Sequence, residues 1–391
     1  MPASAHAQAL DLASAADAFV SARVAADSFS GTVLVARGGK AVYQRAAGLA
    51  DREHGLTMQL GTRLQIASAT KLYTHIAVRQ LEQAGKLSLT DTVGKFLPAY
   101  PNATVRSRVT VEQLLRHRSG VGSFWNERFT ARAPQVRSVQ DYLELFQNDS
   151  LLFEPGTGEA YSNGGYVILG AIIEKLTGQS YHDYIREHVF APAGMTGTFP
   201  YDSRAIRADA AIGYTSQSLN APMTGDRRLA GPGQRPGYER RDSAPAGNPS
   251  PGLRIMGPDG RPLSGEEARQ AMARRAGTRG PRRPNTGTQA GMSGPAGGDY
   301  STVGDFLKLA TALLEHRLLD STRTAALLGA RFASGQDFRA NGGAPGTNAE
   351  FSIFPTGEVI VVLSNYDPPA ATAVAQYLRS LVAPVPSGSA R

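Results

Sequence analysis

The sequence predicts an α/β plus all-α protein, in which an antiparallel sheet built from both chain ends is flanked by helices and receives an inserted helical region. Three observations lead to this prediction. Strand-like runs occur near both ends of the 391-residue chain, and helical apolar spacing dominates between them. A basic segment rich in glycine and proline interrupts the pattern before the second group of strands.

The first expected elements are a helix and a β-hairpin. Residues Leu10–Phe29 carry apolar side chains at helical spacing. The runs Gly31–Ala36 and Ala41–Arg45 are β-rich, and Gly38-Gly39 between them is typical of a hairpin turn.

Helices are expected from about Ala69 to Gly194, where glycine or proline separates segments with helical apolar spacing. The expected helices are Leu72–Ala84, Val111–Arg116, Val139–Phe146, Tyr166–Leu176 and Tyr181–Val189.

The C-terminal part contains an amphipathic helix, a second hairpin and a last helix. Their expected ranges are Thr302–Leu319, Ala349–Phe354 with Glu358–Leu363 around the turn Pro355–Gly357, and Ala370–Val382. We therefore predict a sheet domain made of residues 1–66 and 296–391, a helical domain of residues 67–223, and a flexible insertion of residues 224–295.

The insertion carries the charge of the protein. Residues 227–283 contain 13 Arg, no Lys and five acidic residues, which accounts for the whole net charge of +8. This stretch also holds ten Gly and eight Pro, a composition typical of disordered sequence, with one short helix expected at Ser264–Arg275. Such a segment binds nucleic acid or another polyanion in some proteins, but a solvated loop is the favoured interpretation.

Composition excludes several classes. The chain has no Cys, which excludes disulfides, thiol nucleophiles and Cys-ligated metals. No apolar run is long enough for a membrane span.

Ala5-His6-Ala7 has the small-x-small pattern of an export cleavage site, which predicts a periplasmic or secreted protein. Because no charged or apolar export region precedes it, a disordered end of a cytoplasmic protein is the alternative.

The most informative motif is Ser68-Ala-Thr-Lys71. Of the six Lys residues, only Lys71 has a Ser three positions before it. At the start of a helix this spacing places both side chains on one face, where a desolvated amine can activate a hydroxyl for acyl transfer. The alternative is a helix cap at Ser68 with a solvated Lys71.

A second motif, Tyr161-Ser162-Asn163, lies in a turn-rich loop before a predicted helix. In extended chain, Tyr161 and Asn163 point to the same side and can reach one cavity. The same frame at Tyr100-Pro101-Asn102 is interrupted by proline, and we interpret it as structural.

Other chemistries lack support. No Gly-x-Ser-x-Gly elbow is present. His182 and His188 are spaced for different faces of a helix, so no metal site is predicted. Gly231-Pro-Gly233 is incomplete as a nucleotide loop, and no cofactor is expected.

Taken in order, these motifs resemble the serine β-lactamase and penicillin-binding-protein-like hydrolases, especially the class C β-lactamase and family VIII esterase branch. The resemblance covers nearly the whole chain outside the insertion. The matching blocks are Phe29–Ala36, Ser68–Lys71, Gly85–Asp91, Val109–Leu115 with Ser119-Gly120, Tyr161–Gly165, Pro295–Thr302, Gly342–Gly346 and Val361–Asn365.

The resemblance implies a β-lactamase/transpeptidase-like fold with the site between its two parts. It implies Ser68 as nucleophile, Lys71 as its proton partner, and Tyr161 as a shared acid/base group kept acidic by the Lys71 ammonium. Asn163 would position the substrate, and the backbone amides of Ser68 and Gly343 would form the oxyanion hole.

One position departs from that family. Its third motif, a Lys or His followed by any residue and Gly, falls on Ala340-Asn341-Gly342, where no cation stands. Arg339 is adjacent but points to the opposite face of a strand. A shift of register that uses Asn341 would restore a polar group but no charge.

The predicted function is therefore that of a serine hydrolase with an acyl-Ser68 intermediate, most favourably a carboxylesterase acting on small esters, which need no cation for a carboxylate. A β-lactamase, D,D-carboxypeptidase or D-aminopeptidase acting on amides with the same site is the first alternative. The second is a non-catalytic binding protein that uses the basic insertion. The sequence does not predict the oligomeric state.

Overall fold

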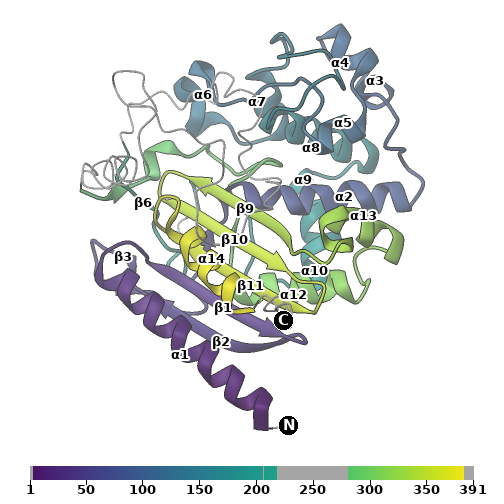
Figure 1. Cartoon of the computed structure of the whole chain (residues 1–391). Helices are drawn as coiled ribbons and strands as arrows, with labels where there is room; N and C mark the ends of the chain where they lie inside the picture. The colour runs from purple at the N-terminus through teal and green to yellow at the C-terminus, as the bar shows by residue number, and fades with distance from the viewer. Residues whose placement is uncertain (1–2, 206, 218–280, 383–391) are drawn as a thin grey trace, which may run out of the picture.

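A five-stranded antiparallel sheet forms the centre of the computed structural model, which describes residues 3–205, 207–217 and 281–382 (Figure 1). The strand order is β2-β1-β11-β10-β9. The strands are β1 (Gly31–Arg37), β2 (Lys40–Ala47), β9 (Phe338–Ala344), β10 (Thr347–Ile353) and β11 (Glu358–Ser364). Strand β1 pairs with β11, with Gly31 opposite Ser364, so the sheet is built from both chain ends as expected.

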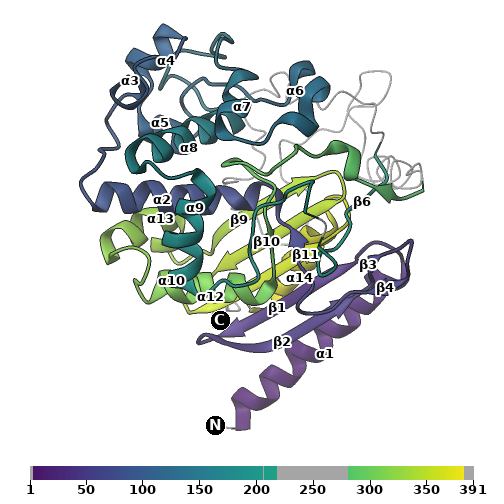
Figure 2. The same cartoon turned by 180° about the vertical axis from the view of Figure 1, so that it is seen from behind.

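Both faces of this sheet are buried, because apolar side chains occupy both sides of its strands. Val33 and Val35 of β1 belong to the core beneath α1 (Ala3–Ala25) and α14 (Ala370–Val382). Leu34 and Ala36 belong to the core on the opposite face. Figure 2 shows that face from behind, covered by α12 (Val303–Leu314) and by helices of the inserted region.

The inserted region is helical, as expected. Its helices are α2 (Lys71–Gln83), α3 (Val93–Phe96), α4 (Ala103–Arg108), α5 (Val111–Leu115), α6 (Glu127–Arg132), α7 (Val139–Glu144), α8 (Asn163–Thr177), α9 (Tyr181–Ile185) and α10 (Ala191–Ala193). Short 3-10 turns lie at η1 (Ala67–Thr70) and η2 (Ala133–Gln135), and a π-helical turn, η3 (Arg186–Phe190), extends α9.

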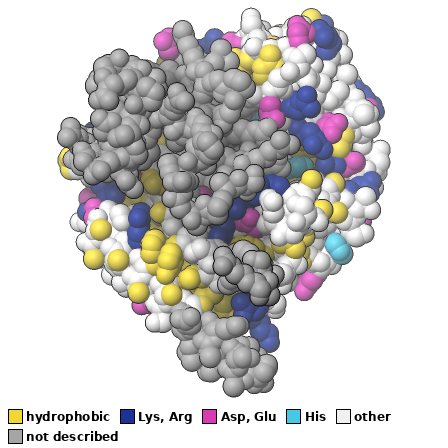
Figure 3. All heavy atoms as spheres, viewed as in Figure 1, with side chains coloured by type: hydrophobic (Ala, Val, Ile, Leu, Met, Phe, Trp, Pro, Cys, Tyr) yellow, Lys and Arg dark blue, Asp and Glu magenta, His cyan; other side chains and the backbone are white. Residues whose placement is uncertain are grey.

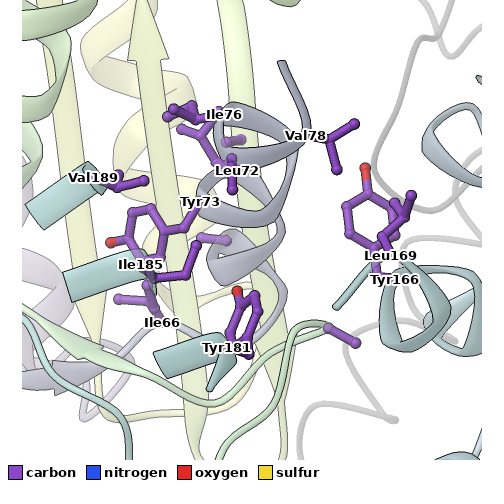
Figure 4. Packing of buried hydrophobic residues seen from close by; sticks show 14 of the residues in the cluster. Ile66, Leu72, Tyr73, Ile76, Val78, Tyr166, Leu169, Tyr181, Ile185 and Val189 are labelled. Atoms are coloured by element: carbon purple, nitrogen blue, oxygen red, sulfur yellow. The ribbon is translucent and has the colours of Figure 1, made fainter. Parts of the chain in front are cut away.

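Helix α2 is buried on several sides, which fixes it between the sheet and the helical region. In Figure 4, Tyr73 lies beside Ile185 and Val189, whereas Val78 lies toward Tyr166 and Leu169 of α8. Tyr73 and Val78 have no exposed surface. A helix buried on more than one face has little freedom to shift, so the first residues of α2 are held firmly.

Several expected elements differ in extent from the structure, and several observed elements had no predicted range. Helix α1 ends at Ala25 rather than Phe29, because the chain turns at Asp27 (φ 46°) and buries the Phe29 side chain before β1. Helix α12 ends at Leu314 rather than Leu319. Helix α13 (Ser321–Ala333), with a non-helical Gly329, had no prediction.

The last part of the expected flexible insertion is ordered, which corrects its C-terminal limit. Strand β7 (Arg283–Pro284) pairs with β6 (Tyr214–Thr215), and a 3-10 turn, η4 (Thr286–Thr288), follows. The Asn285 side chain is buried and donates from Nδ2 to Pro345 O (2.8 Å). Polar groups of the main fold therefore hold this stretch in place. The expected helix Ser264–Arg275 lies outside the described residues.

Short strand pairs complete the described chain. They are β3 (Leu49–Asp51) with β4 (Leu56–Thr57), and β5 (Leu64–Gln65) with β8 (Tyr300–Ser301). Within the described residues, no helix combines the length and the apolar character needed to cross a membrane.

The buried side chain of Asn348 joins the sheet to the start of α14. Its Oδ1 accepts hydrogen bonds from Ala371 N (2.8 Å) and Thr372 N (3.0 Å). Its Nδ2 donates to Gly342 O of β9 (3.0 Å). Asn348 thus caps first-turn amides of α14 from another element and fixes the edge strand β9.

We expect Asn348→Ala to lower the free energy of unfolding by about 3 kcal/mol, because it leaves several buried donors and acceptors without partners. Urea unfolding measures this change. Asn102→Ala, which removes the cap of α4 bonded to Val105 N, is the comparison and should cost about 1 kcal/mol. An equal or smaller loss for Asn348→Ala would contradict the role assigned to Asn348.

Candidate active site

Ser68 lies in the 3-10 turn η1, directly before α2, so the expected position at a helix start is confirmed. Ala67, the residue before it, has φ 44°, a region that non-glycine residues rarely occupy. Ala67 O accepts from Gly298 N (3.2 Å), and Ile66 N donates to Asp299 O (2.9 Å). The loop 296–299 therefore holds the turn in a strained conformation that is common at functional sites.

The Lys71 amine contacts three oxygens inside the protein. Nζ lies 3.2 Å from Ser68 Oγ and 2.8 Å from Asn163 Oδ1, and it also contacts Ala296 O. The Lys71 side chain is buried, and none of these contacts is a carboxylate. Ser68 and Asn163 therefore meet at the Lys71 amine, although Asn163 lies 92 positions after Lys71 in the chain.

Burial lowers the pKa of Lys71 well below its ordinary value of 10.5. In the neutral form, two N–H groups can donate to Asn163 Oδ1 and Ala296 O. The remaining lone pair then faces the Ser68 hydroxyl and can accept its proton. The arrangement is that of a general base beside a nucleophile.

Two aromatic rings face the same amine. Lys71 Nζ lies 4.8 Å from the ring centroid of Tyr161 and 5.4 Å from that of Tyr166. Ring faces attract a cation, so both rings favour the ammonium that forms when Ser68 gives up its proton. The resemblance implied that the Lys71 ammonium keeps Tyr161 acidic, and the ring of Tyr161 does lie beside that amine. Burial lowers the pKa of Lys71 and so favours its neutral form.

Asn163 reaches Lys71 from the first turn of α8. Ser162 caps this helix, because its Oγ accepts from Gly165 N (2.8 Å). The Asn163 amide donates from Nδ2 to Ser123 Oγ (3.1 Å), which orients Oδ1 toward Lys71. Tyr161 and Asn163 lie on the same side of the chain as expected, with Asn163 inside the helix rather than before it.

His117 belongs to this site and was missed by the sequence analysis. Its Nδ1 accepts from Ser162 N (3.1 Å), and its ring centroid lies 4.7 Å from that of Tyr161. Burial lowers the pKa of His117 to about 3, so its ring is neutral. His117 positions the Tyr161 segment. The one available signal was its place between the blocks Val109–Leu115 and Ser119-Gly120.

Strand β9 lies against the Ser68 turn, and Gly342 permits the contact. A Cβ at Gly342 would lie 1.9 Å from Ile66 O and 3.0 Å from Ala69 N. Gly343 follows and is exposed at the edge of the sheet. Ala340, two positions before Gly342, is buried in the core and supplies no cation.

Asn341 does not replace the missing cation, which corrects the proposed shift of register. With its amide oriented to satisfy its neighbours, Nδ2 donates to Glu350 Oε2 (3.1 Å). Glu350 in turn accepts from Thr372 Oγ1 of α14 (2.7 Å). The Asn341 side chain is thus engaged on the α14 side of the sheet. Arg339 forms a two-point ion pair with Asp337, at 2.7 and 2.9 Å.

Metal chemistry has no visible site in the described part of the chain, where no group of three or more His, Asp or Glu side chains could hold an ion.

Comparisons with known proteins place the chain among enzymes and penicillin-binding proteins that share this fold. The family model described as Beta-lactamase matches residues 16–383. The chain is 36% identical over 179 residues to Penicillin-binding protein 4* of Bacillus subtilis, which covers 45% of this chain and 39% of that protein. It is 29% identical over 197 residues to a putative D-alanyl-D-alanine carboxypeptidase of Escherichia coli, covering 46% and 45%.

The chain thus spans less than half of the length of these curated relatives. Among solved structures, a penicillin binding protein from Bacillus halodurans is similar with a TM-score of 0.68 and 25% identity. That match covers 92% of this chain and 98% of the other.

We expect the labelling of Ser68 by a fluorophosphonate to speed up as pH rises, with a midpoint well below 10.5, because neutral Lys71 is the reactive form. The second-order rate constant of labelling is followed by intact mass between pH 6 and pH 10, in steps of about one pH unit. Lys71→Ala should slow labelling by about 10²–10⁴-fold.

Two variants identify the titrating group. Asn163→Asp places a carboxylate beside Lys71 and should move the midpoint to higher pH. Burial raises the pKa of Asp299 to about 7, and Asp299→Asn removes that titration while leaving the Lys71 midpoint. A midpoint that disappears in Asp299→Asn would contradict the assignment to Lys71.

Proposed function

Because the chain belongs to the β-lactamase family, we propose that it is a serine hydrolase that works through an acyl-Ser68 intermediate and acts as a carboxylesterase on small esters. The observation that carries this proposal is the buried Lys71 amine, 3.2 Å from Ser68 Oγ and held toward its neutral form.

In the first half of the reaction, Ser68 Oγ attacks the ester carbonyl carbon and its proton moves to Lys71 Nζ. The carbonyl oxygen becomes negative and would be held by the backbone amides of Ser68 and Gly343. As the carbon–oxygen bond to the alcohol breaks, the leaving oxygen takes a proton from Lys71, directly or through Tyr161. Ser68 is then acylated and Lys71 is neutral again.

The second half repeats this sequence with water. Water attacks the acyl carbon and gives a proton to Lys71, and Tyr161, whose ring lies beside that amine, would share the transfer. The bond from the carbon to Ser68 Oγ breaks, Oγ takes the proton back, and a carboxylic acid leaves. Two neutral acceptors, Asn163 Oδ1 and Ala296 O, hold the Lys71 amine through both halves.

The preference for esters follows from β9. At Ala340 a buried methyl group stands where the related hydrolases carry a cation for the substrate carboxylate. A β-lactam or a peptide ending in D-alanine carries such a carboxylate next to the reacting group, and it would have no counter-charge on this strand. A simple ester has no charge at that place, so the missing cation does not weaken its binding.

Amide hydrolysis is the second candidate, and it is supported by the names of relatives, including the putative D-alanyl-D-alanine carboxypeptidase of Escherichia coli. A chromogenic cephalosporin and a D-amino-acid amide test it. Turnover of either one faster than of short p-nitrophenyl esters would replace the esterase assignment.

We expect wild-type protein to hydrolyse p-nitrophenyl acetate and butyrate and to show an acyl adduct on Ser68 by intact mass. Ser68→Ala should lose at least about 10³-fold in kcat/KM, because the nucleophile is gone. Ser107→Ala, a control at an exposed serine of α4 whose Oγ donates within its own helix to Ala103 O (2.8 Å), should retain most activity. Equal rates for wild type and Ser68→Ala would refute the proposal, and a chain that no ester, lactam or fluorophosphonate labels would favour the non-catalytic alternative.

A further inference from the structure

A large cleft opens next to the Lys71 site, between the helical region and the sheet edge. Its volume is about 820 Å³, within the range of small-molecule pockets. Residues of α2, of the segment after α5, of α13 and of β9 line it. In the view of Figure 3, dark blue side chains gather at the upper right, over the region where Figure 1 places α5, α2 and α13.

One wall of the cleft is apolar. Helix α13 contributes small and aliphatic side chains along its length, including Ala325, Ala326 and Leu328. Gly329, with φ 79°, interrupts the helix within this wall. Such a surface of small side chains suits an alkyl chain laid along it.

The cleft as a whole is basic. Among the described residues that line it there are five Arg and three carboxylates, an excess of two positive charges, and the five include Arg331 of α13. The wall formed by α2 and the segment after α5 carries Arg79, Arg116 and Arg118. Arg118 is exposed and makes one hydrogen bond, from Nη2 to Gly156 O (2.6 Å), with no carboxylate partner in the described chain. Arg116 pairs with Glu112 at 3.0 Å, but its side chain remains 63% exposed.

Two neutral histidines complete this wall. His75 lies one helical turn after Lys71 on α2, and its buried Nε2 has no hydrogen-bond partner among the described residues. Burial, with Arg79 and Arg116 nearby, lowers the pKa of His75 to about 3. Since His117 is also neutral, the positive charge of the cleft comes from arginines and does not change near neutral pH.

The cleft adjoins the catalytic residues along two segments. Strand β9 begins at Phe338 in the cleft and passes Gly342, which lies against the Ser68 turn. The chain from Glu159 in the cleft continues to Tyr161 beside Lys71. Two short chain segments therefore join the lining of the cleft to the catalytic residues.

We propose that this cleft binds the distal carboxylate of the substrate, so that the preferred substrate is a half-ester of an aliphatic dicarboxylic acid. The alkyl chain lies on α13, and Arg118, with Arg116, receives the carboxylate. The inference rests on the proposed esterase function. In this proposal the positive charge lies several bonds away from the reacting carbon. Beside the reacting carbon itself, β9 carries no cation at Ala340.

The kinetic test uses mono-p-nitrophenyl esters of the dicarboxylic acids from glutarate to sebacate. Each is compared with its neutral analogue, in which the free carboxyl group is converted to a methyl ester. For the best chain length we expect kcat/KM to exceed that of the neutral analogue by about tenfold, mainly through KM. Arg118→Gln should remove that advantage and leave the neutral ester unchanged. Arg118→Lys should restore part of it, and salt raised from about 0.05 M to about 0.5 M should reduce it.

Arg186→Gln is the control, because Arg186 is also an exposed arginine (68%) but does not line the cleft; unlike Arg118, it pairs with a carboxylate (Asp183, 2.6 Å). It should leave both substrates unchanged. Equal kcat/KM for charged and neutral esters, or an equal loss in Arg118→Gln and Arg186→Gln, would overturn the inference while leaving the esterase proposal intact.

A binding measurement separates the cleft from the chemistry. Calorimetry with Ser68→Ala protein compares monomethyl adipate with dimethyl adipate, neither of which needs to react. We expect the monoester to bind about tenfold more tightly, and Arg118→Gln to abolish the difference. Equal affinities would overturn the inference even if no ester is hydrolysed.

Discussion

The proposed chemistry depends on one buried amine that contacts no carboxylate among the described residues. Lys71 Nζ is surrounded by two neutral oxygen acceptors, a hydroxyl and two aromatic rings. Burial disfavours its charged form, and no carboxylate among its contacts compensates. Burial therefore favours the amine form of Lys71, which can accept the proton of Ser68. The rings of Tyr161 and Tyr166 lower the cost of the charge while the amine holds that proton.

The fold supplies the rigidity that this arrangement needs. Helix α2 is packed between the sheet and α8, so the Lys71 side chain has few alternative positions (Figure 4). The loop 296–299 holds the strained turn at Ala67, and Gly342 brings β9 into backbone contact with it. Asn348 then ties β9 to α14. Sequence segments from three distant parts of the chain thus meet at one hydroxyl.

The parts of the fold and of the site that depend on local sequence patterns could be predicted from the sequence. The two hairpins and α14 follow from strand and helix periodicity, and the pairing of Ser68 with Lys71 follows from a spacing of three at a helix start. His117 was not predictable, because its role depends on a contact with Ser162 that joins two loops. The engagement of Asn341 by Glu350 depends on strand register, and the charge state of Lys71 depends on burial, neither of which a single sequence displays.

The protonation state of Lys71 is the most direct test of this account. Protein labelled with ¹³C,¹⁵N-lysine gives six Nζ signals, and loss of one in Lys71→Met assigns it. The account predicts that the Lys71 signal changes from ammonium to amine at a pH well below that of the other five lysines. Six signals that all titrate together near the ordinary lysine pKa would contradict it.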